Sequence, residues 1–400
     1  MLLTKKHYIV ISLIWLTIAV VFAAIIRSSF VVGMGSWFNY KYFLHTHSHL
    51  AFLGWIFNII YYFLLKQFKL LDSKKYGYLF IALNISVLGM LLTFPFQGYA
   101  LWSIIFSTLH ILISYIFAIF FYKDTKGNNS INRKFAIAAI VFMVVSSIGP
   151  FSLAPIIANG LKDSIWYDMA IYFYLHFQYN GWFLLSIISM TAYSIKIKDN
   201  DNWQRAFNLF VISTILNFSL STLWTDPGWV INIISVLSSL MQFHALFLMS
   251  KDIFIHLRKM DKFKAMLMKI IYLLFILKIF FALAGSIQEV AMFVYYNRNL
   301  VIGYLHLIFL GIVTPFFFIK ISEEYAILNS SNHKLALIIY LFIFLLSELL
   351  LTTTSVGFNG DVILFISDLI VYTTWILAGI TIYLSSRYKL EALNHNKSNS

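Results

Sequence analysis

The sequence has no cysteine among its 400 residues. Disulfides, thiolate metal sites, cysteine nucleophiles and covalent attachment of a prosthetic group through a cysteine pair are therefore excluded. Charged residues are also scarce, at 11%, and no Gly-rich phosphate-binding loop is present, so an intrinsic ATPase is not indicated. Any metal site must use histidine, carboxylate, methionine, tyrosine or backbone groups as ligands.

Long apolar runs are what the sequence has in abundance, with 60% hydrophobic residues. A hydrocarbon core about 30 Å thick needs roughly 20 apolar residues per helix. Twelve runs joined by short loops reach this length: 8–26, 43–65, 77–96, 100–122, 135–157, 168–191, 205–223, 228–249, 265–288, 298–320, 334–356 and 361–385. They predict an all-α, polytopic membrane protein of about twelve transmembrane helices. We expect residues 1–390 to form a single integral membrane domain and residues 391–400 a polar, disordered cytoplasmic tail.

Basic side chains outnumber acidic ones, with 29 Lys and Arg against 16 Asp and Glu. The basic loops follow even-numbered runs and lie at 66–75, 122–134, 196–205 and 251–264. The positive-inside rule therefore predicts that these loops and both termini are cytoplasmic, in an integral protein of the bacterial inner membrane. Because the excess charge follows topology, the lipid bilayer is the expected partner and no nucleic acid is indicated.

Histidines within the runs fall only on even-numbered ones: His45, His47 and His49 on the second, His110 on the fourth, His176 on the sixth, His244 on the eighth and His306 on the tenth. His49, His176 and His306 each follow a charged residue at the outer end of their run by eight positions. At 1.5 Å per residue, each is expected about 12 Å below that charge. Three helices thus offer an imidazole at a similar depth, in the outer half of the bilayer.

Two explanations fit these imidazoles. Polar groups in a membrane usually face the bundle interior and bond a neighbouring helix, and we favour this structural role for His110 and His244. Imidazole is also the usual metal ligand where thiolate is absent, and we favour metal or haem ligation for the coplanar set. His110 stays a candidate metal ligand. On the second run, His45 and His49 share one helix face while His47 points nearly opposite, so this helix can serve two neighbours.

The histidine motifs resemble those of a known family. The stretch "HSHLAFLGW" (47–55) is similar to the His-x-His element of the catalytic subunit of haem-copper oxidases and nitric oxide reductases. It is equally similar to an element of the NnrS proteins, twelve-helix haem- and copper-containing membrane proteins. The stretch "GYLHLIFLG" (303–311) resembles the oxidase helix-ten pattern, which implies that His306 is a low-spin haem ligand and that Tyr304 replaces the high-spin ligand.

The same resemblance extends to the sixth run, where "YLHFQYNGWFLL" (174–185) is similar to a segment with a copper-ligand histidine. It implies that role for His176. The axial partner of His306 stays open, because the resemblance favours His45 whereas depth favours His49. His47 and His110 complete the candidate metal ligands, and Arg298 is a candidate partner for a haem propionate or an interfacial anchor.

Departures from the family limit the expected activity. Residues 206–224 contain no counterpart of the paired histidines that hold copper in the family, and Tyr304 stands at the high-spin position. We therefore expect a degenerate relative with a non-covalent b-type, bis-histidine haem, with or without copper. It would transfer electrons to or from a redox partner, or handle nitric oxide or oxygen, without full oxygen-reductase activity. Whether it is an enzyme and its oligomeric state stay open.

Two alternatives stay open from the sequence. One is a secondary transporter with a histidine-lined ion or metal site, since twelve helices with both ends inside is also a common transporter layout. The other is a structural or assembly subunit without a cofactor. Lys278, Glu348 and Asp368 lie within runs and are candidates for a proton relay or for structural pairing.

Overall fold

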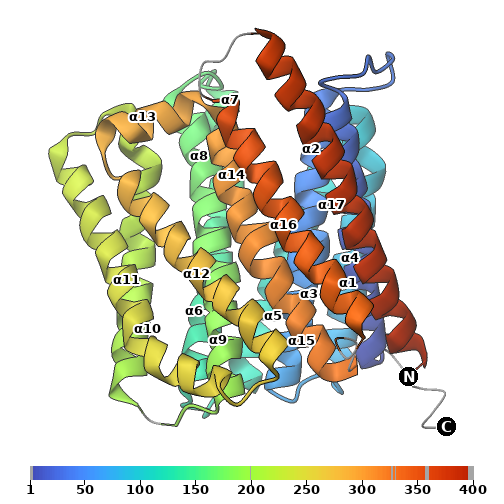
Figure 1. Cartoon of the computed structure of the whole chain (residues 1–400). Helices are drawn as coiled ribbons and strands as arrows, with labels where there is room; N and C mark the ends of the chain where they lie inside the picture. The colour runs from blue at the N-terminus through green and yellow to red at the C-terminus, as the bar shows by residue number, and fades with distance from the viewer. Residues whose placement is uncertain (1–2, 199, 326–327, 329, 356–359, 395–400) are drawn as a thin grey trace. The chain divides into compact units, whose positions relative to one another are not determined.

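A computed structural model describes residues 3–198, 200–325, 328, 330–355 and 360–394. In this part of the chain the regular structure is entirely helical (Figure 1). Within these residues, eleven helices are long and apolar enough to cross a membrane, each over one of the predicted runs. The remaining run, 168–191, lies in a continuous helix from Ile165 to Ile195, about 46 Å long, whose amide and tyrosine side chains lower its hydropathy.

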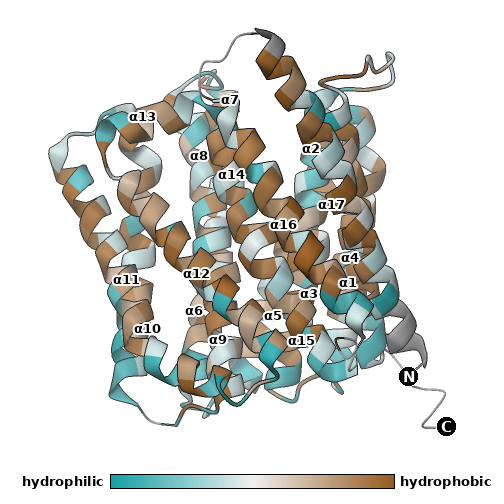
Figure 2. Cartoon of the chain, in the orientation of Figure 1, coloured by the Kyte–Doolittle hydropathy of each residue, from teal (hydrophilic) through white to brown (hydrophobic). Residues whose placement is uncertain are grey.

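The helices are α1 (Lys5–Ser28), α2 (Tyr40–His49), η1 (Leu50–Ile56), α3 (Phe57–Gln67), α4 (Lys74–Gln97), α5 (Leu101–Asp124), α6 (Ile131–Ser146), α7 (Ile148–Ala158), α8 (Ile165–His176), η2 (Phe177–Phe183), α9 (Leu184–Ile195), α10 (Asp201–Leu216), η3 (Asn217–Thr225), α11 (Trp229–Leu257), α12 (Lys262–Ala284), α13 (Gln288–Tyr296), α14 (Arg298–His306), η4 (Leu307–Val313), α15 (Thr314–Tyr325), α16 (Ser331–Thr353) and α17 (Gly360–Asn394). Apolar side chains dominate their middle turns (Figure 2).

Since α17 continues to Asn394, the first four residues of the predicted tail are helical. The remainder, 395–400, lies outside the described residues.

The chain divides into two compact units. Unit 1 comprises Met1–Phe117 and Thr314–Ser400, and unit 2 comprises Ala118–Val313. In unit 1, α1 packs along α17 and against η1, and Trp55 of η1 donates its indole hydrogen to the Thr314 hydroxyl at 3.2 Å. Trp15 of α1 likewise donates to the Asn84 side chain of α4 at 2.6 Å. Buried indoles are thus hydrogen-bonded inside the unit, as membrane burial requires.

Unit 2 has its own core, in which α10 packs on α11 and α6 packs on α9. One buried charge within this core is paired across two helices. Lys278 of α12 is fully buried and donates to the amide oxygen of Gln242 on α11 at 3.0 Å. The partner that the structure gives to this lysine is therefore an amide of the adjacent helix, whereas the sequence suggested a carboxylate.

Candidate cofactor site

Three of the predicted ligand histidines occupy the same position in their helices. His49, His176 and His306 each end an α-helix, and a seven-residue π-helical segment starts at the next residue, namely η1, η2 and η4. A π-helical insertion widens the helix locally and is frequent at functional sites. The chain therefore has the same local irregularity beside three imidazoles on three different spans.

A sequence signal for these junctions exists, although neither hydropathy nor histidine spacing revealed it. Each histidine is followed five residues later by a glycine, in "HLAFLG" (49–54), "HFQYNG" (176–181) and "HLIFLG" (306–311). Two of the glycines lie where another helix approaches closely. A Cβ atom on Gly54 would stand 2.9 Å from the Trp15 side chain, and one on Gly181 would overlap the Phe142 side chain.

The His49 ring in unit 1 is fixed by a local hydrogen bond. Its Nδ1 donates to the backbone oxygen of His45 at 2.8 Å. Because a carbonyl oxygen only accepts, the proton is on Nδ1 and Nε2 carries the lone pair that can bind a metal. That Nε2 lies 3.3 Å from the hydroxyl oxygen of Tyr99, which can donate to it. The backbone of one turn thus orients this imidazole for ligation, as hydrogen bonds around metal-binding histidines commonly do.

Aromatic rings enclose the face that His45 and His49 share. The Phe94 ring centroid is 4.4 Å from that of His49, and the Tyr99 centroid is 4.6 Å from that of His45. Tyr99 follows Gly98, the residue that caps the end of α4. The φ of +59° at Gly98 suits glycine, and its missing side chain leaves room for Tyr42. The result is an apolar wall beside two imidazoles.

The ring of His47 is oriented toward α1 instead. Its Nδ1 donates to the backbone oxygen of Ala19 at 2.9 Å, so its Nε2 also carries the lone pair. This arrangement agrees with the helical spacing, which predicted that His47 points away from His45 and His49. The second run therefore offers imidazoles on two sides.

His110 of α5 is buried in unit 1, and among the described residues its Nε2 has no hydrogen-bond partner. The Phe57 ring meets it edge-on at 4.9 Å, and the imidazole is near enough to His49 for the two to interact electrostatically. Buried polar atoms are almost always paired, so an orphaned ring nitrogen is a place where a ligand or water is expected. His110 is thus a better candidate for ligation than its isolated position in the sequence suggested.

His176 in unit 2 is held differently. Its Nε2 donates to the backbone oxygen of Thr214 on α10 at 2.8 Å, and its Nδ1 accepts from the side-chain amide of Asn180 at 3.2 Å. Both ring nitrogens therefore have protein partners. The assignment of His176 as a copper ligand stays a prediction, and such ligation would require the Thr214 or the Asn180 bond to break.

Tyr304 and His306 lie on α14 of unit 2, two residues apart and both partly buried. The Tyr304 ring meets Tyr179 of η2 at 6.1 Å and near a right angle. Arg298 begins α14 and is exposed, as expected for an interfacial cation. Among the described residues no group of three or more histidine or carboxylate side chains is placed to hold a metal ion.

An aromatic cluster near Arg298 was not anticipated from the sequence. Trp224 of η3 and Tyr295 of α13 stack with their ring planes 3° apart and centroids at 3.9 Å. The Tyr295 hydroxyl donates to the Asp168 carboxylate of α8 at 3.0 Å. Burial, together with this carboxylate, raises the pKa of Tyr295 to about 12. These contacts join α8, η3 and α13.

Comparisons with known proteins identify the fold. No family model and no curated protein matches the sequence. A chain from the cryo-EM structure of a haem-copper terminal oxidase dimer is similar in structure, with a TM-score of 0.71 and 12% identity. The match covers 97% of this chain and 84% of that chain. This chain therefore has the fold of a haem-copper terminal oxidase, which confirms the oxidase-like membrane bundle expected from its histidine motifs.

Proposed function

We propose that this protein is a membrane haem protein that transfers electrons or handles nitric oxide or oxygen. The observation that carries the proposal is the position of His49, directly before a π-helical segment and with Nε2 available for a metal, in a chain with the haem-copper oxidase fold. A low-identity structural match supports the fold alone, so the cofactor and the role rest on the histidines.

The proposed cofactor is a non-covalent b-type haem with two axial imidazoles. The sequence motif assigns one of them to His306, and we assign the other to His49, with His45 as the alternative. The orientation of the His49 ring favours His49, since its Nδ1 is already bonded to a backbone carbonyl and its Nε2 carries the lone pair. When bound, haem would supply one-electron chemistry.

The protein side chains have separate tasks in this proposal. The His45 carbonyl holds the His49 ring in one tautomer and makes the imidazole a stronger donor. Phe94 and Tyr99 place aromatic rings beside it, and the Tyr99 hydroxyl, which can donate to Nε2 in the haem-free protein, would release that nitrogen for ligation. Arg298 is proposed to pair with a propionate.

We do not include oxygen reduction in the proposed activity. Residues 206–224 contain no histidine, and Tyr304 stands two residues before His306. Both ring nitrogens of His176 have partners inside unit 2. A site of this composition favours electron transfer, or gas binding after one axial ligand is displaced, over the splitting of oxygen. Copper ligation by His47 or His110 and the relationship to the NnrS proteins stay predictions.

The test is a dithionite-reduced minus oxidised absorption spectrum of the detergent-purified protein after haem has been supplied. We expect the sharp α and Soret bands of six-coordinate haem. They should be lost in His306→Ala and in His49→Ala but kept in His244→Ala, a matched control that removes an exposed imidazole from α11. Loss in His45→Ala with retention in His49→Ala would assign His45 instead.

A featureless spectrum from folded, haem-supplied protein would contradict the proposal. The transporter and the cofactor-free subunit would then be the remaining explanations, and ion flux in vesicles would separate them. Folding of each variant is checked by its elution as a single species and by its helical circular dichroism.

A further inference from the structure

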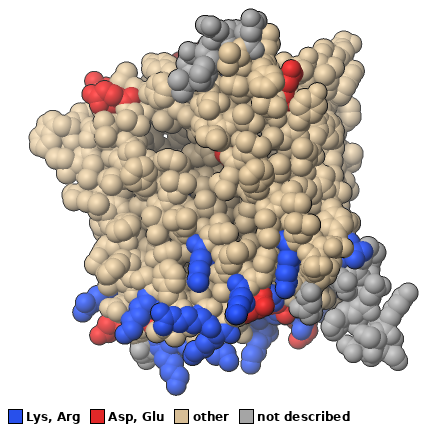
Figure 3. Space-filling view, in the orientation of Figure 1, with Lys and Arg blue, Asp and Glu red and all other residues tan. Residues whose placement is uncertain are grey.

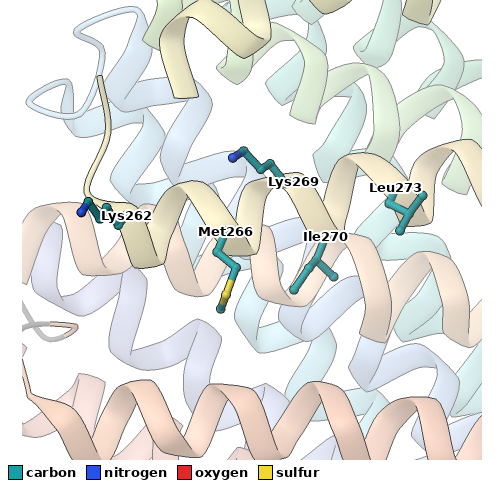
Figure 4. Close-up of a pocket in the computed structure, with 5 residues that line it drawn as sticks. All are labelled: Lys262, Met266, Lys269, Ile270 and Leu273. Atoms are coloured by element: carbon teal, nitrogen blue, oxygen red, sulfur yellow. The ribbon is translucent and has the colours of Figure 1, made fainter. Parts of the chain in front are cut away.

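One face of α12 carries a surface hollow far in sequence from the candidate ligand histidines. Its volume is about 260 Å³, and its lining residues are Lys262, Met266, Lys269, Ile270 and Leu273 (Figure 4). With 3.6 residues per turn, these five positions fall within an arc of about 100°, so they form one stripe along the helix. We call this stripe and hollow the α12 groove.

The groove faces away from the interior of unit 2. Leu273 is 62% exposed and Met266 40% exposed, whereas Leu267 and Ile271, on the other side of α12, are buried. In a helix that crosses a membrane, exposed apolar side chains of this kind contact lipid. The natural occupant of the groove is therefore a molecule of the bilayer.

Positive charge at one end of the groove is not paired with an acidic side chain in the part of the chain that the structure describes. Lys262 and Lys269 form no ion pair with any residue that the structure describes. Two acidic groups close in sequence have other partners. Asp261 caps α12 by accepting from the backbone of Phe263 and Lys264, and Asp252 of α11 accepts from the Trp203 indole. In this part of unit 2, Lys and Arg gather at the end where α11 joins α12 (Figure 3).

Lys262 and Lys269 lie seven residues apart on the stripe, and both side chains extend toward the same end of α12 (Figure 4). Lys269 lies about 10 Å further along the helix axis. Its side chain runs back toward the end of α12 that carries Lys262 (Figure 4). Long cationic side chains near helix ends extend in this way to keep the ammonium group at the membrane–water interface. The groove thus combines two ammonium groups with the apolar side chains of Met266, Ile270 and Leu273.

We propose that the α12 groove binds one anionic phospholipid of the leaflet on the basic side, predicted to be cytoplasmic. Lys262 and Lys269 hold the phosphate, and an acyl chain lies along Met266, Ile270 and Leu273. Basic pockets on the cytoplasmic side of membrane helices recognise anionic headgroups by this combination of charge and apolar surface. The site is independent of the proposed haem, and its occupancy does not require that cofactor.

The experiment is native mass spectrometry of the delipidated full chain, titrated with phosphatidylglycerol and with phosphatidylcholine of identical acyl chains. A lysine near an anionic lipid surface favours binding by about fivefold, so both lysines together predict a preference of about 25-fold for the first phosphatidylglycerol bound. The double variant K262Q/K269Q should lose this preference and bind both lipids equally. K262R/K269R should keep it, because the charge is retained.

The matched control is K123Q/K126Q, which removes two exposed lysines at the end of α5, also in unit 2 but outside the groove. It should keep the preference of the wild-type chain. The proposal is overturned if the wild-type chain shows no preference for phosphatidylglycerol, or if K262Q/K269Q keeps it. Equal losses in K262Q/K269Q and K123Q/K126Q would also overturn it, because they would show a general attraction of charge rather than a site. All four substitutions are on exposed positions, and unchanged thermal unfolding confirms that the variants are folded.

Discussion

His49 in unit 1 and His176 in unit 2 share one local motif but differ in what holds their rings. Each ends an α-helix, precedes a π-helical segment and is followed five residues later by a glycine. The His49 ring bonds a backbone carbonyl of its own helix and keeps a nitrogen lone pair beside Tyr99. The His176 ring uses one nitrogen on a second helix and the other on Asn180.

This difference shows that the motif makes room for an imidazole, whereas the residues around it determine what that imidazole binds. A π-helical turn and a glycine allow another helix to approach and leave room beside the imidazole. In unit 2 the carbonyl of Thr214 occupies that place, so His176 joins two helices. In unit 1 the rings of Phe94 and Tyr99 lie beside the imidazole instead, and this is the environment in which we propose that His49 binds a cofactor. Three similar motifs therefore do not imply three ligands.

The largest effect on stability is expected at His176. In haem-free protein, His176→Ala should lower the free energy of unfolding by about 3 kcal/mol, because it opens a cavity and leaves the Thr214 carbonyl and the Asn180 amide unpaired in the core. His49→Ala should lower it by about 1 kcal/mol, since it removes a bond within one helix turn and a 3.3 Å contact with the exposed Tyr99. Unfolding is followed by tryptophan fluorescence with increasing denaturant in detergent.

The exposed His244 on α11 is the control for this pair, and His244→Ala should change the unfolding free energy by less than about 0.5 kcal/mol. Equal losses for His49→Ala and His176→Ala would show that the two motifs have the same structural role. The distinction between a ligand and a helix-joining histidine would then have to be abandoned.

A smaller effect is expected from the glycine of the motif. Gly181→Ala places a methyl group against the buried Phe142 side chain, and the overpacking should cost about 2 kcal/mol of unfolding free energy. Gly54→Ala meets the Trp15 side chain at 2.9 Å and should cost a comparable amount. Gly379→Ala in α17 is the control, because a Cβ atom there would meet no described atom within 4 Å, and alanine should be neutral or stabilising by up to about 1 kcal/mol.

Thermal unfolding of the three variants gives the comparison. If Gly181→Ala and Gly379→Ala behaved alike, close approach at the π-helical junction would not be what requires glycine. If Gly54→Ala alone were harmless, the two motifs would differ in their packing as well as in their hydrogen bonds.

Hydropathy predicted the spans because each span depends on its own residues. Over the described residues all twelve runs lie mainly in helices, and the opposite orientation of His47 relative to His45 and His49 followed from helical spacing alone. The contacts that distinguish the histidines join residues far apart in the chain. Thr214 is 38 positions from His176, and Tyr99 is 50 positions from His49. No local pattern encodes such pairs, so these two distant partners could be found only from the tertiary structure.

The smallest effect is expected at the aromatic cluster of unit 2, which has no counterpart in the histidine motifs. Tyr295→Phe keeps the stack on Trp224 but removes the hydrogen bond to Asp168, and should lower the unfolding free energy by about 1 kcal/mol at neutral pH. Tyr295 has a pKa of about 12 in the folded protein, above its ordinary value of 10.0. A group whose pKa is raised by folding stabilises the protein at pH values below its pKa in the unfolded chain. That contribution is lost as the pH rises through its pKa in the folded protein.

The stability difference between the wild-type chain and Tyr295→Phe should therefore be constant up to about pH 10 and shrink as the pH approaches 12. Thermal unfolding of both proteins across this pH range measures it, with Tyr296→Phe, an exposed neighbour, as the control that should show no such change. A difference that persists unchanged above about pH 11 would mean that the Tyr295 proton does not stabilise unit 2 through Asp168. The stack on Trp224 would then be the main contribution of Tyr295, which Tyr295→Leu would reveal by a larger loss at every pH.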